Sequence, residues 1–495
     1  MKSEVLNRAR EYEAAHGSQI PAEERPAFHI SPYVGWMNDP NGFSWYKGQY
    51  HLFYQYNPYK TKWDSMHWGH VVSTDLLHWE YLPAALAPDM DYDHVGCFSG
   101  SAAELPDGKQ LLIYTAVDHE TLADGTVKDI QTQALAVGDG IDYEKYERNP
   151  VLSEKDLPEG GSKVDFRDPK IWKGEDGLFY CVIGNRPKDG SGQILLYSSE
   201  NGFDWKFVSV LAENKNRYGK MWECPDFFTL DGKQVLLVSP QDMLPEGFEY
   251  HNGNGTLCLI GELDPETHTL KEQYHQAVDY GIDFYAMQTV LSPDGRRIMI
   301  GWMQNWDTIS HCSEESKWFS QMSIPRELSV RDGRLYQKPV SELENMRKNK
   351  VEYKDVVVED TTVTLEHIEG RMVDMELVIR PEDRENIYKK FAVRFAQNEQ
   401  FHTALSFRPY ESILKIDRKF SGTRRAFIHQ RRCLVRGDSN ELRLRIILDR
   451  FSAEVFINNG EQVMSAVIYT DQEAKGISFF ADGKVKMDVV KYDLL

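Results

Sequence analysis

Three carboxylates in the sequence share an unusual local setting. Asp39 and Asp168 each precede a proline, and Glu223 lies two residues before one, in the segments NDPNG, FRDP and WECPD. An ionised carboxylate can attack an electrophilic carbon, while a second carboxyl that keeps its proton can protonate a leaving group. Like charges close together and partial burial raise one pKa and so divide these two roles. If the fold brings the three residues together, they predict the chemistry that cleaves glycosidic bonds.

A recurring turn predicts how they meet. At five places roughly 60 residues apart, a glycine turn, four times Asp-Gly, precedes a strand of aromatic and branched residues. The five turn glycines are Gly48, Gly108, Gly177, Gly232 and Gly295. Five small sheets of this size predict a β-propeller. A sixth such turn, Asp332-Gly333, follows too soon for a further blade and is assigned to the closing one.

The residues nine positions before these glycines predict where a functional site lies. They are Asp39, Ser99, Asp168, Glu223 and Ala286. If the strand before each turn is the innermost of its blade, equal register places all five at one level around the axis. Nothing in local folding requires carboxylates at three of them, so we expect a common pocket.

The remaining chain predicts an all-β protein with four segments. Residues 1–28 form an N-terminal extension with a short helix near Arg8 to Ala15, 29–340 the propeller, 341–350 a linker with some helical character, and 351–495 an antiparallel β-sandwich of alternating strands. The sandwich contains no comparable carboxylate set, so we expect a structural role and an association between copies of the chain through it.

Composition excludes several partners. The formal net charge of -20 disfavours nucleic acid and anionic membranes. The charged start, MKSEVLNRAREYEAAHG, has no apolar region typical of a secretory signal, and no apolar run is long enough for a membrane helix. Six scattered cysteines indicate neither a zinc site nor a disulfide framework. We therefore expect a cytoplasmic protein that needs no cofactor.

Several sequence blocks closely resemble those of glycoside hydrolase family 32, the invertases, sucrose-6-phosphate hydrolases, inulinases and levanases. The blocks are WMNDPNG (36–42), CFSGS (97–101), FRDP (166–169), WECPD (222–226), MSIPREL (322–328) and LDRFSAEVFINNGE (448–461). The resemblance implies a five-bladed propeller followed by a β-sandwich, the same architecture that the turns predict. It also implies a retaining β-fructofuranosidase that acts on sucrose, sucrose 6-phosphate or short β-fructans.

The resemblance also implies roles for individual residues. Asp39 would be the nucleophile that forms a covalent fructosyl ester, Glu223 the general acid and then base, and Asp168 the residue that binds fructose hydroxyls and stabilises the transition state. Substrate contacts are implied for Asn38, Gln55, Trp63, Phe98, Ser99 and Arg167, and for Tyr285 and Trp302 near the rim. Aromatic rings suit the C–H faces of a sugar. A retaining mechanism requires the nucleophile and acid carboxyl groups about 5–5.5 Å apart.

Two departures from the family pattern and two alternatives remain. Phe451 stands where a smaller residue is commoner, and Met287-Gln288-Thr289 replaces a more usual Pro-Gln pair, which weakens the assignment of Tyr285.

A fructosyltransferase would differ only in which hydroxyl intercepts the intermediate. A non-catalytic fructan-binding propeller would lack one of the three carboxylates.

Three weaker signals favour structural interpretations. His67 and His70 would point to opposite faces of a strand, so a shared metal is not expected. Asp89, Asp91 and Asp93 resemble the start of a calcium loop, but the glycine and glutamate that such a loop needs are missing. We interpret the basic stretch from Arg418 to Arg432 as the solvated face of a hairpin. The alternative is that it forms an interface or contacts an anion.

Overall fold

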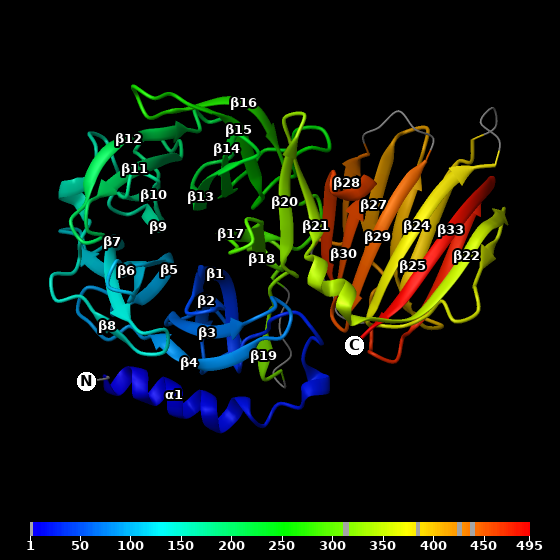
Figure 1. Cartoon of the computed structure of the whole chain (residues 1–495), viewed down its shortest axis with the longest axis horizontal. Helices are drawn as coiled ribbons and strands as arrows, with labels where there is room; N and C mark the ends of the chain where they lie inside the picture. The colour runs from blue at the N-terminus through cyan, green and yellow to red at the C-terminus, as the bar shows by residue number, and fades with distance from the viewer. Residues whose placement is uncertain (1–2, 310–315, 383–386, 423–427, 436–440) are drawn as a thin grey trace.

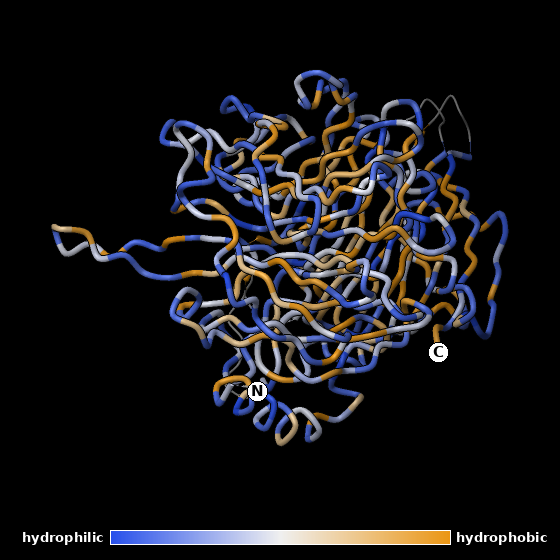
Figure 2. The backbone as a smooth tube through the Cα atoms, turned by 60° about the vertical axis from the view of Figure 1, so that its left-hand side comes forward, coloured by the Kyte–Doolittle hydropathy of each residue, from blue (hydrophilic) through white to orange (hydrophobic). Residues whose placement is uncertain are grey.

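The computed structural model contains a five-bladed β-propeller followed by a β-sandwich (Figure 1). It describes residues 3–309, 316–382, 387–422, 428–435 and 441–495. The predicted fold class is therefore confirmed. Apolar residues concentrate along the strands, whereas the turns between them are mostly hydrophilic (Figure 2).

Each propeller blade contains four antiparallel strands, which are consecutive in the chain in every blade but the last. Blade I contains β1 (Gly35–Tyr46), β2 (Gln49–Asn57), β3 (His67–Ser73) and β4 (Glu80–Leu86); blade II contains β5 (Gly96–Glu104), β6 (Gln110–Thr121), β7 (Val127–Gly138) and β8 (Tyr143–Lys145). Blade III contains β9 (Phe166–Lys173), β10 (Phe179–Asn185), β11 (Gln193–Ser199) and β12 (Lys206–Glu213); blade IV contains β13 (Trp222–Leu230), β14 (Lys233–Pro240), β15 (Leu257–Leu263) and β16 (Leu270–Gln276). Blade V contains β17 (Tyr285–Leu291), β18 (Arg297–Trp302), β20 (Arg326–Arg331) and β21 (Arg334–Pro339).

The inner strands close a ring. The first strands of the blades, β1, β5, β9, β13 and β17, each contact the next, and β17 contacts β1. Strand β19 (Trp318–Phe319), which follows β18 in the chain, pairs in parallel with Gly35 and Trp36 of β1 and so joins the last blade to the first. Each of the five predicted glycine turns connects an inner strand to the second strand of its blade, and Asp332-Gly333 connects β20 to β21.

All five inner strands carry a β-bulge in their N-terminal half. In each, two residues oppose one on the neighbouring strand, and this local irregularity bends the strand and re-aims its side chains. The bulges lie between Met37 and Pro40, Cys97 and Gly100, Arg167 and Lys170, Glu223 and Asp226, and Tyr285 and Gln288. The predicted site residues therefore do not share one register: Asp39 and Ser99 are second bulge residues, Asp168 and Ala286 are first ones, and Glu223 lies just before its bulge.

The N-terminal helix α1 (Glu4–Gly17) packs along β4, the outer strand of blade I. The Ser3 side chain caps the helix by accepting from the N–H of Leu6, which satisfies one of the free donors of the first turn. The helix buries Glu13, whose carboxylate accepts from the N–H of Ala84 at 2.7 Å. The expected helix from Arg8 to Ala15 thus lies within a longer one. A short 3₁₀ turn, η1 (Ala22–Glu24), follows it, and η2 (Glu154–Asp156) precedes blade III.

The sandwich consists of two antiparallel sheets. One contains β22 (Arg347–Glu359), β24 (Val373–Pro381), β29 (Leu442–Asp449), β30 (Ser452–Ile457), β31 (Gln462–Val467) and β33 (Lys484–Leu494). The other contains β23 (Thr362–Val363), β25 (Lys390–Gln397), β26 (Thr403–Arg408), β27 (Ile413–Asp417), β28 (Gln430–Leu434) and β32 (Gly476–Asp482). A last 3₁₀ turn, η4 (Asn458–Gly460), lies between β30 and β31.

The expected linker is shorter than 341–350. Its helical part is the 3₁₀ segment η3 (Ser341–Met346), and the chain is already in strand β22 from Arg347 onward. The difference arises because Arg347 and Lys348 pair with Leu494 and Asp493 of β33, a contact between distant parts of the chain that local composition does not reveal.

A buried charged network joins the propeller to the sandwich. His29, at the start of the propeller, donates from Nδ1 to Asp449 at 2.8 Å and from Nε2 to Glu454 at 2.9 Å. Arg326 of β20 pairs with the same Glu454 and with Asp279. The blocks MSIPREL and LDRFSAEVFINNGE therefore meet across the domain junction.

Arg418, in the basic stretch, also belongs to this junction. Its side chain is buried and pairs with Asp283 of the propeller at 2.6 Å. For this residue the interface interpretation is correct and the solvated face is wrong, because a buried guanidinium needs a charged partner. Arg424 and Arg425 lie outside the described residues.

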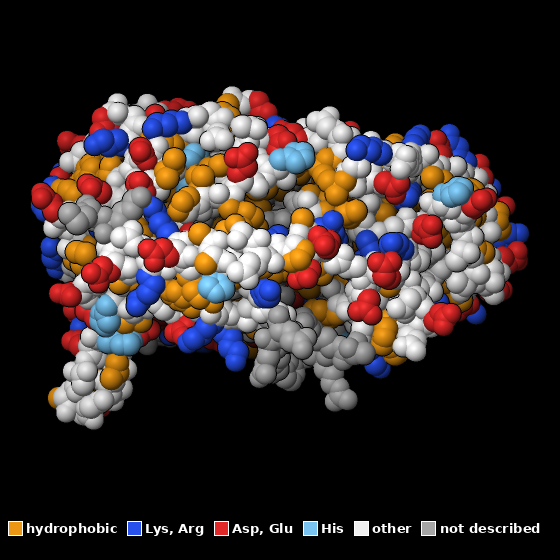
Figure 3. Space-filling view, turned by 90° about the horizontal axis from the view of Figure 1, so that it is seen from below, with side chains coloured by type: hydrophobic (Ala, Val, Ile, Leu, Met, Phe, Trp, Pro, Cys, Tyr) orange, Lys and Arg blue, Asp and Glu red, His pale blue; other side chains and the backbone are white. Residues whose placement is uncertain are grey.

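The surface carries interspersed charges of both signs on the face shown in Figure 3. Among the described helices, none is long and apolar enough to cross a membrane. The cysteines in the described ranges, namely Cys97, Cys181, Cys224, Cys258 and Cys433, are free thiols. Cys312 lies outside those ranges.

Candidate active site

Two of the three predicted carboxylates, Asp39 and Asp168, contact the side chain of Cys224, and the charge of Glu223 acts on both of them. The Cys224 Sγ lies 3.5 Å from Oδ2 of Asp39 and 3.7 Å from Oδ2 of Asp168, and its N–H donates to the same oxygen of Asp168 at 2.9 Å. Glu223 is the preceding residue on β13. Residues from β1, β9 and β13, far apart in the chain, thus converge where the inner strands bulge.

Asp39 is surrounded by hydrogen-bond donors. The hydroxyl of Ser99 donates to Oδ2 at 2.6 Å, and the amide of Asn38 donates to Oδ1 at 3.1 Å. Burial raises the pKa of Asp39, the Ser99 hydrogen bond lowers it, and the charge of Glu223 raises it again. The donors favour the carboxylate form, which is the form a nucleophile needs.

Asp168 occupies a strained backbone position. Its φ of 66° lies in the left-handed region, which non-glycine residues seldom adopt outside turns and functional sites. Its N–H donates to the hydroxyl of Thr115 at 2.9 Å, and its side chain is buried. Burial raises the pKa of Asp168; the neighbouring Arg167 lowers it, and the charges of Glu223 and Asp39 raise it further.

Glu223 is held from both sides. Arg167 donates from Nε to one carboxylate oxygen at 3.0 Å, and the hydroxyl of Tyr285 donates to the other at 2.7 Å. Arg167 is itself anchored by Asp165 at 2.7 Å. Two donors from neighbouring blades therefore fix the orientation of the Glu223 carboxyl group, and Arg167 links it to the strand that carries Asp168.

The other predicted contact residues differ in how far they are exposed. Trp63, on the loop after β2, is 47% exposed and packs edge-on against Phe98 with ring centroids 5.7 Å apart. Gln55 is buried opposite the bulge of β1, and its amide donates to the carbonyl of Cys97 at 2.9 Å. Trp63 and Phe98 can offer a ring face or edge to a ligand, whereas Gln55 also braces the neighbouring blade.

Tyr285 and Trp302 do not lie at a rim. Both side chains are buried, with relative exposures of 1% and 0%. Tyr285 directs its hydroxyl to Glu223, and Trp302 packs edge-on against Tyr285, Trp36 and Trp306. A ring with no exposed face cannot stack on a sugar, so Trp302 supports the site from behind. The expectation of a rim position is corrected for both residues.

Several residues around the site were not predicted from the sequence. The indole of Trp36 donates to Asn38 at 2.7 Å and so orients the amide that contacts Asp39. Thr115 holds the strained backbone of Asp168, and Asp165 holds Arg167. The Cys224 thiol contacts two of the site carboxylates. Thr115 and Asp165 lack a local sequence signal, because their contacts come from the packing of neighbouring strands.

The residues considered for metals have protein partners. Asp89 and Asp93 both contact the ammonium group of Lys145, and His70 hydrogen bonds with His51 at 3.0 Å. Within the described part of the chain, no group of three His, Cys, Asp or Glu side chains could hold a metal ion.

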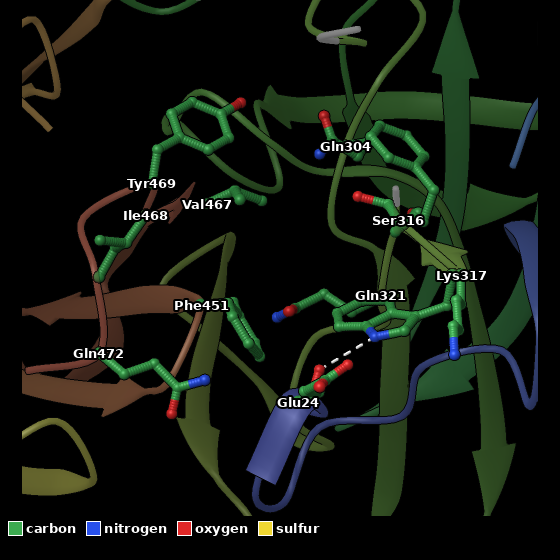
Figure 4. A pocket seen from close by; sticks show the side chains of 13 residues that line it. Glu24, Gln304, Ser316, Lys317, Gln321, Phe451, Val467, Ile468, Tyr469 and Gln472 are labelled. Atoms are coloured by element: carbon green, nitrogen blue, oxygen red, sulfur yellow. Dashed lines mark hydrogen bonds between the residues drawn. The ribbon is translucent and has the colours of Figure 1, made fainter. Parts of the chain in front are cut away.

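A separate cavity of about 360 Å³ lies between blade V and the sandwich (Figure 4). Phe451, Ile468 and Tyr469 border it on the sandwich side, and Gln304 and Gln321 on the propeller side. None of the three site carboxylates lines it. The cavity is therefore distinct from the carboxylate cluster.

Family models match nearly the whole chain. Residues 29–339 match the glycosyl hydrolases family 32 N-terminal domain, and residues 342–494 match the glycosyl hydrolases family 32 C-terminal domain. Among curated proteins, a raffinose invertase of Escherichia coli is 38% identical over 461 residues, 92% of either chain. A sucrose-6-phosphate hydrolase of Bacillus subtilis is 34% identical over 99% of this chain and 98% of its own.

Solved structures give the same picture. A mutant family 32 β-fructofuranosidase of Bombyx mori in complex with sucrose superposes with a TM-score of 0.83 at 35% identity, covering 100% of this chain and 99% of its own. The sucrose-6-phosphate hydrolase of Lactobacillus gasseri superposes with a TM-score of 0.82 at 28% identity, covering 100% and 97%.

Proposed function

Since the chain belongs to glycosyl hydrolase family 32, we propose that it is a retaining β-fructofuranosidase that hydrolyses terminal β-D-fructofuranosides. Its substrates are sucrose, sucrose 6-phosphate or short fructo-oligosaccharides, the class to which its relatives' names refer. The observation that supports this proposal is that Asp39 and Asp168 both contact Cys224, the residue that follows Glu223.

In the first step Asp39 attacks the anomeric carbon of the fructosyl unit. The bond between that carbon and the bridging oxygen breaks, and Glu223 gives its proton to the oxygen, so that the alcohol leaves. The donors Ser99 and Asn38 aim the Asp39 carboxylate, and Tyr285 and Arg167 aim Glu223. The product of this step is a fructosyl ester on Asp39.

In the second step water replaces Asp39. Glu223, now ionised, takes a proton from the water, whose oxygen attacks the same carbon, and the ester bond to Asp39 breaks. Two displacements at one carbon restore the original configuration. Asp168 accepts hydrogen bonds from fructose hydroxyls and stabilises the positive charge that develops in both transition states.

A hydrolysis panel tests the proposal. The purified chain is incubated with sucrose, sucrose 6-phosphate, 1-kestose, inulin and levan, and free fructose is measured. We expect release from at least the disaccharides, and release in methanol of a β-configured methyl fructoside as evidence of retention. Absence of fructose from every substrate would exclude the hydrolase, and an α-configured product would exclude the retaining mechanism.

We further propose that the protein works in the cytoplasm, because its described cysteines are free and a reducing compartment keeps thiols in that state. Association through the sandwich stays a prediction, which the mass in solution measured by light scattering would test.

A further inference from the structure

We propose that the buried ion pair between Lys170 and Asp226 is a positioning device that sets the separation of Asp168 and Glu223. Lys170 lies two residues after Asp168 on β9, and Asp226 lies three residues after Glu223 on β13. The Lys170 Nζ is 3.0 Å from Oδ2 of Asp226, and both side chains are buried. The inference rests on the proposed function.

The two residues occupy equivalent places in their blades. Each is the first residue that pairs with the second strand after the bulge, Lys170 with Val182 and Asp226 with Leu237. The bulges that carry Asp168 and follow Glu223 therefore end at the two partners of the ion pair. Any change in the distance between these partners moves both bulges relative to each other.

A third inner strand completes the link. The N–H of Thr289 on β17 donates to Oδ2 of Asp226 at 2.6 Å, and the Lys170 ammonium donates to the carbonyl of Thr289 at 2.6 Å. On the neighbouring residue of β17, Gln288 donates to the carbonyl of Gly100 at 3.0 Å and accepts from the N–H of Phe43 at 2.7 Å. These contacts thus link the five inner strands to one another next to the catalytic carboxylates.

Stability alone does not account for a charged pair at this place. Removing a lysine and a carboxylate from water costs free energy that their mutual attraction only partly returns, and well-packed apolar residues often replace such pairs without loss. Directional contacts, however, fix the spacing of strands more tightly than apolar packing does. Because displacements of about 1 Å in a site cost roughly 100-fold in rate, the pair has a consequence for catalysis that an apolar pair would lack.

The test compares Asp226→Asn, Lys170→Met and the double variant with the wild-type protein. We expect kcat for fructose release from sucrose to fall roughly 10- to 100-fold in each, with KM changed by less than about threefold. The double variant should be no slower than the slower single variant, because either change already breaks the link. The folded fraction, measured by circular dichroism and urea unfolding, corrects each kcat.

The partly exposed ion pair between Lys233 and Glu262, which joins β14 to β15 in blade IV, supplies the control. Lys233→Met and Glu262→Gln should keep the wild-type kcat. A corrected kcat within twofold of the wild type for Asp226→Asn and Lys170→Met would overturn the positioning role, as would an equal loss in the control variants. An inactive wild-type protein would instead overturn the proposed function and, with it, the inference that rests on it.

Discussion

The three carboxylates differ in the donors that they accept from. Asp39 accepts from neutral side chains, Ser99 and Asn38, whereas Glu223 accepts from the cationic Arg167 and from Tyr285. Asp168 accepts from a backbone N–H. Side-chain identity at a few neighbouring positions therefore gives three chemically similar groups three different settings, which is the condition for dividing nucleophile, acid and stabiliser among them.

Removal of the nucleophile and of the acid should have distinguishable effects. Asp39→Asn should lower kcat by about 10³-fold or more on every substrate, because no carboxylate remains to form the ester. Glu223→Gln should cause a similar loss on sucrose, but it should slow the first-step release of phenol from an aryl fructoside much less, because that leaving group needs no proton; hydrolysis of the ester stays slow because the base is also lost. Fructose and phenol release measure both effects. Asp91→Asn, at an exposed position, is the control, and an equal slowing of the first step on both substrates for Glu223→Gln would contradict its role as acid.

The pH profile should respond to Ser99. The nucleophile acts only when ionised, so kcat/KM falls as the pH drops through the pKa of Asp39, which burial raises and the Ser99 hydrogen bond lowers. Ser99→Ala removes the contribution that favours the charged form, so the pKa rises further. The acidic limb of kcat/KM should therefore shift to higher pH. A limb that stays in place, as expected for the control Ser329→Ala, would contradict this link.

The three carboxylates of the site can be predicted from the sequence, but the residues that orient them cannot. Asp39, Asp168 and Glu223 stand out because aspartate or glutamate close to a proline recurs in step with the turns. The burial of Trp302 and the contact between Tyr285 and Glu223 depend on how blade V packs against blades I and IV, which leaves no mark on local sequence. Aromatic residues near a motif therefore indicate a lined pocket without telling which rings reach its surface.

At the scale of elements, the bulges explain why counting back from the turns works only approximately. A bulge adds a residue to one strand and so shifts the alternation of side chains beyond it by one position. Asp39, Asp168 and Glu223 therefore reach one pocket from different positions relative to their bulges. The turns and strands follow from sequence, whereas the local irregularity that aims each side chain does not.

Helix α1 should dock more firmly at low pH. Burial raises the pKa of Glu13 to about 7, although the N–H of Ala84 lowers it. The folded state therefore holds a proton that the undocked helix releases between about pH 4.5 and 7, so docking weakens as the pH rises through this window and stays weak above it. Glu13→Gln should abolish this dependence and stabilise docking above pH 7 by at most about 3 kcal/mol.

Amide hydrogen exchange of residues 4–17 at pH 5 and pH 8, corrected for intrinsic rates, measures this docking. Glu11→Gln on the exposed face of the same helix is the matched control and should leave the wild-type difference between the two pH values intact. Equal protection of the wild-type helix at both pH values would contradict the effect.

At the scale of the whole molecule, the two domains are joined by buried charges rather than by the connecting segment. Arg326 and His29 from the propeller side contact Glu454 of the sandwich, and Arg418 of the sandwich contacts Asp283 of the propeller. The sequence correctly predicts a propeller followed by a sandwich, because turn spacing and strand alternation differ. It does not reveal that a lone histidine and a basic stretch serve the junction, since their partners lie more than a hundred residues away.

The junction should lose stability in alkaline solution. Both ring nitrogens of His29 donate to carboxylates, which requires the imidazolium form. Burial alone would lower the pKa of His29, but the hydrogen bonds to Asp449 and Glu454 raise it to about 9. Because the unfolded chain has the ordinary value of 6.5, the stabilisation is complete below pH 6.5 and is lost as the pH rises to 9. The shift corresponds to about 3 kcal/mol.

Urea unfolding at pH 6 and pH 9 measures this loss. The wild-type protein should be less stable at pH 9, and His29→Gln should be less stable than the wild type at pH 6 but nearly equal to it at pH 9, because a neutral side chain cannot gain from a proton. His367→Gln, at an exposed histidine, should follow the wild type. If His29→Gln and the wild-type protein lost stability in parallel between the two pH values, the charge of His29 would not contribute to the stability of the junction.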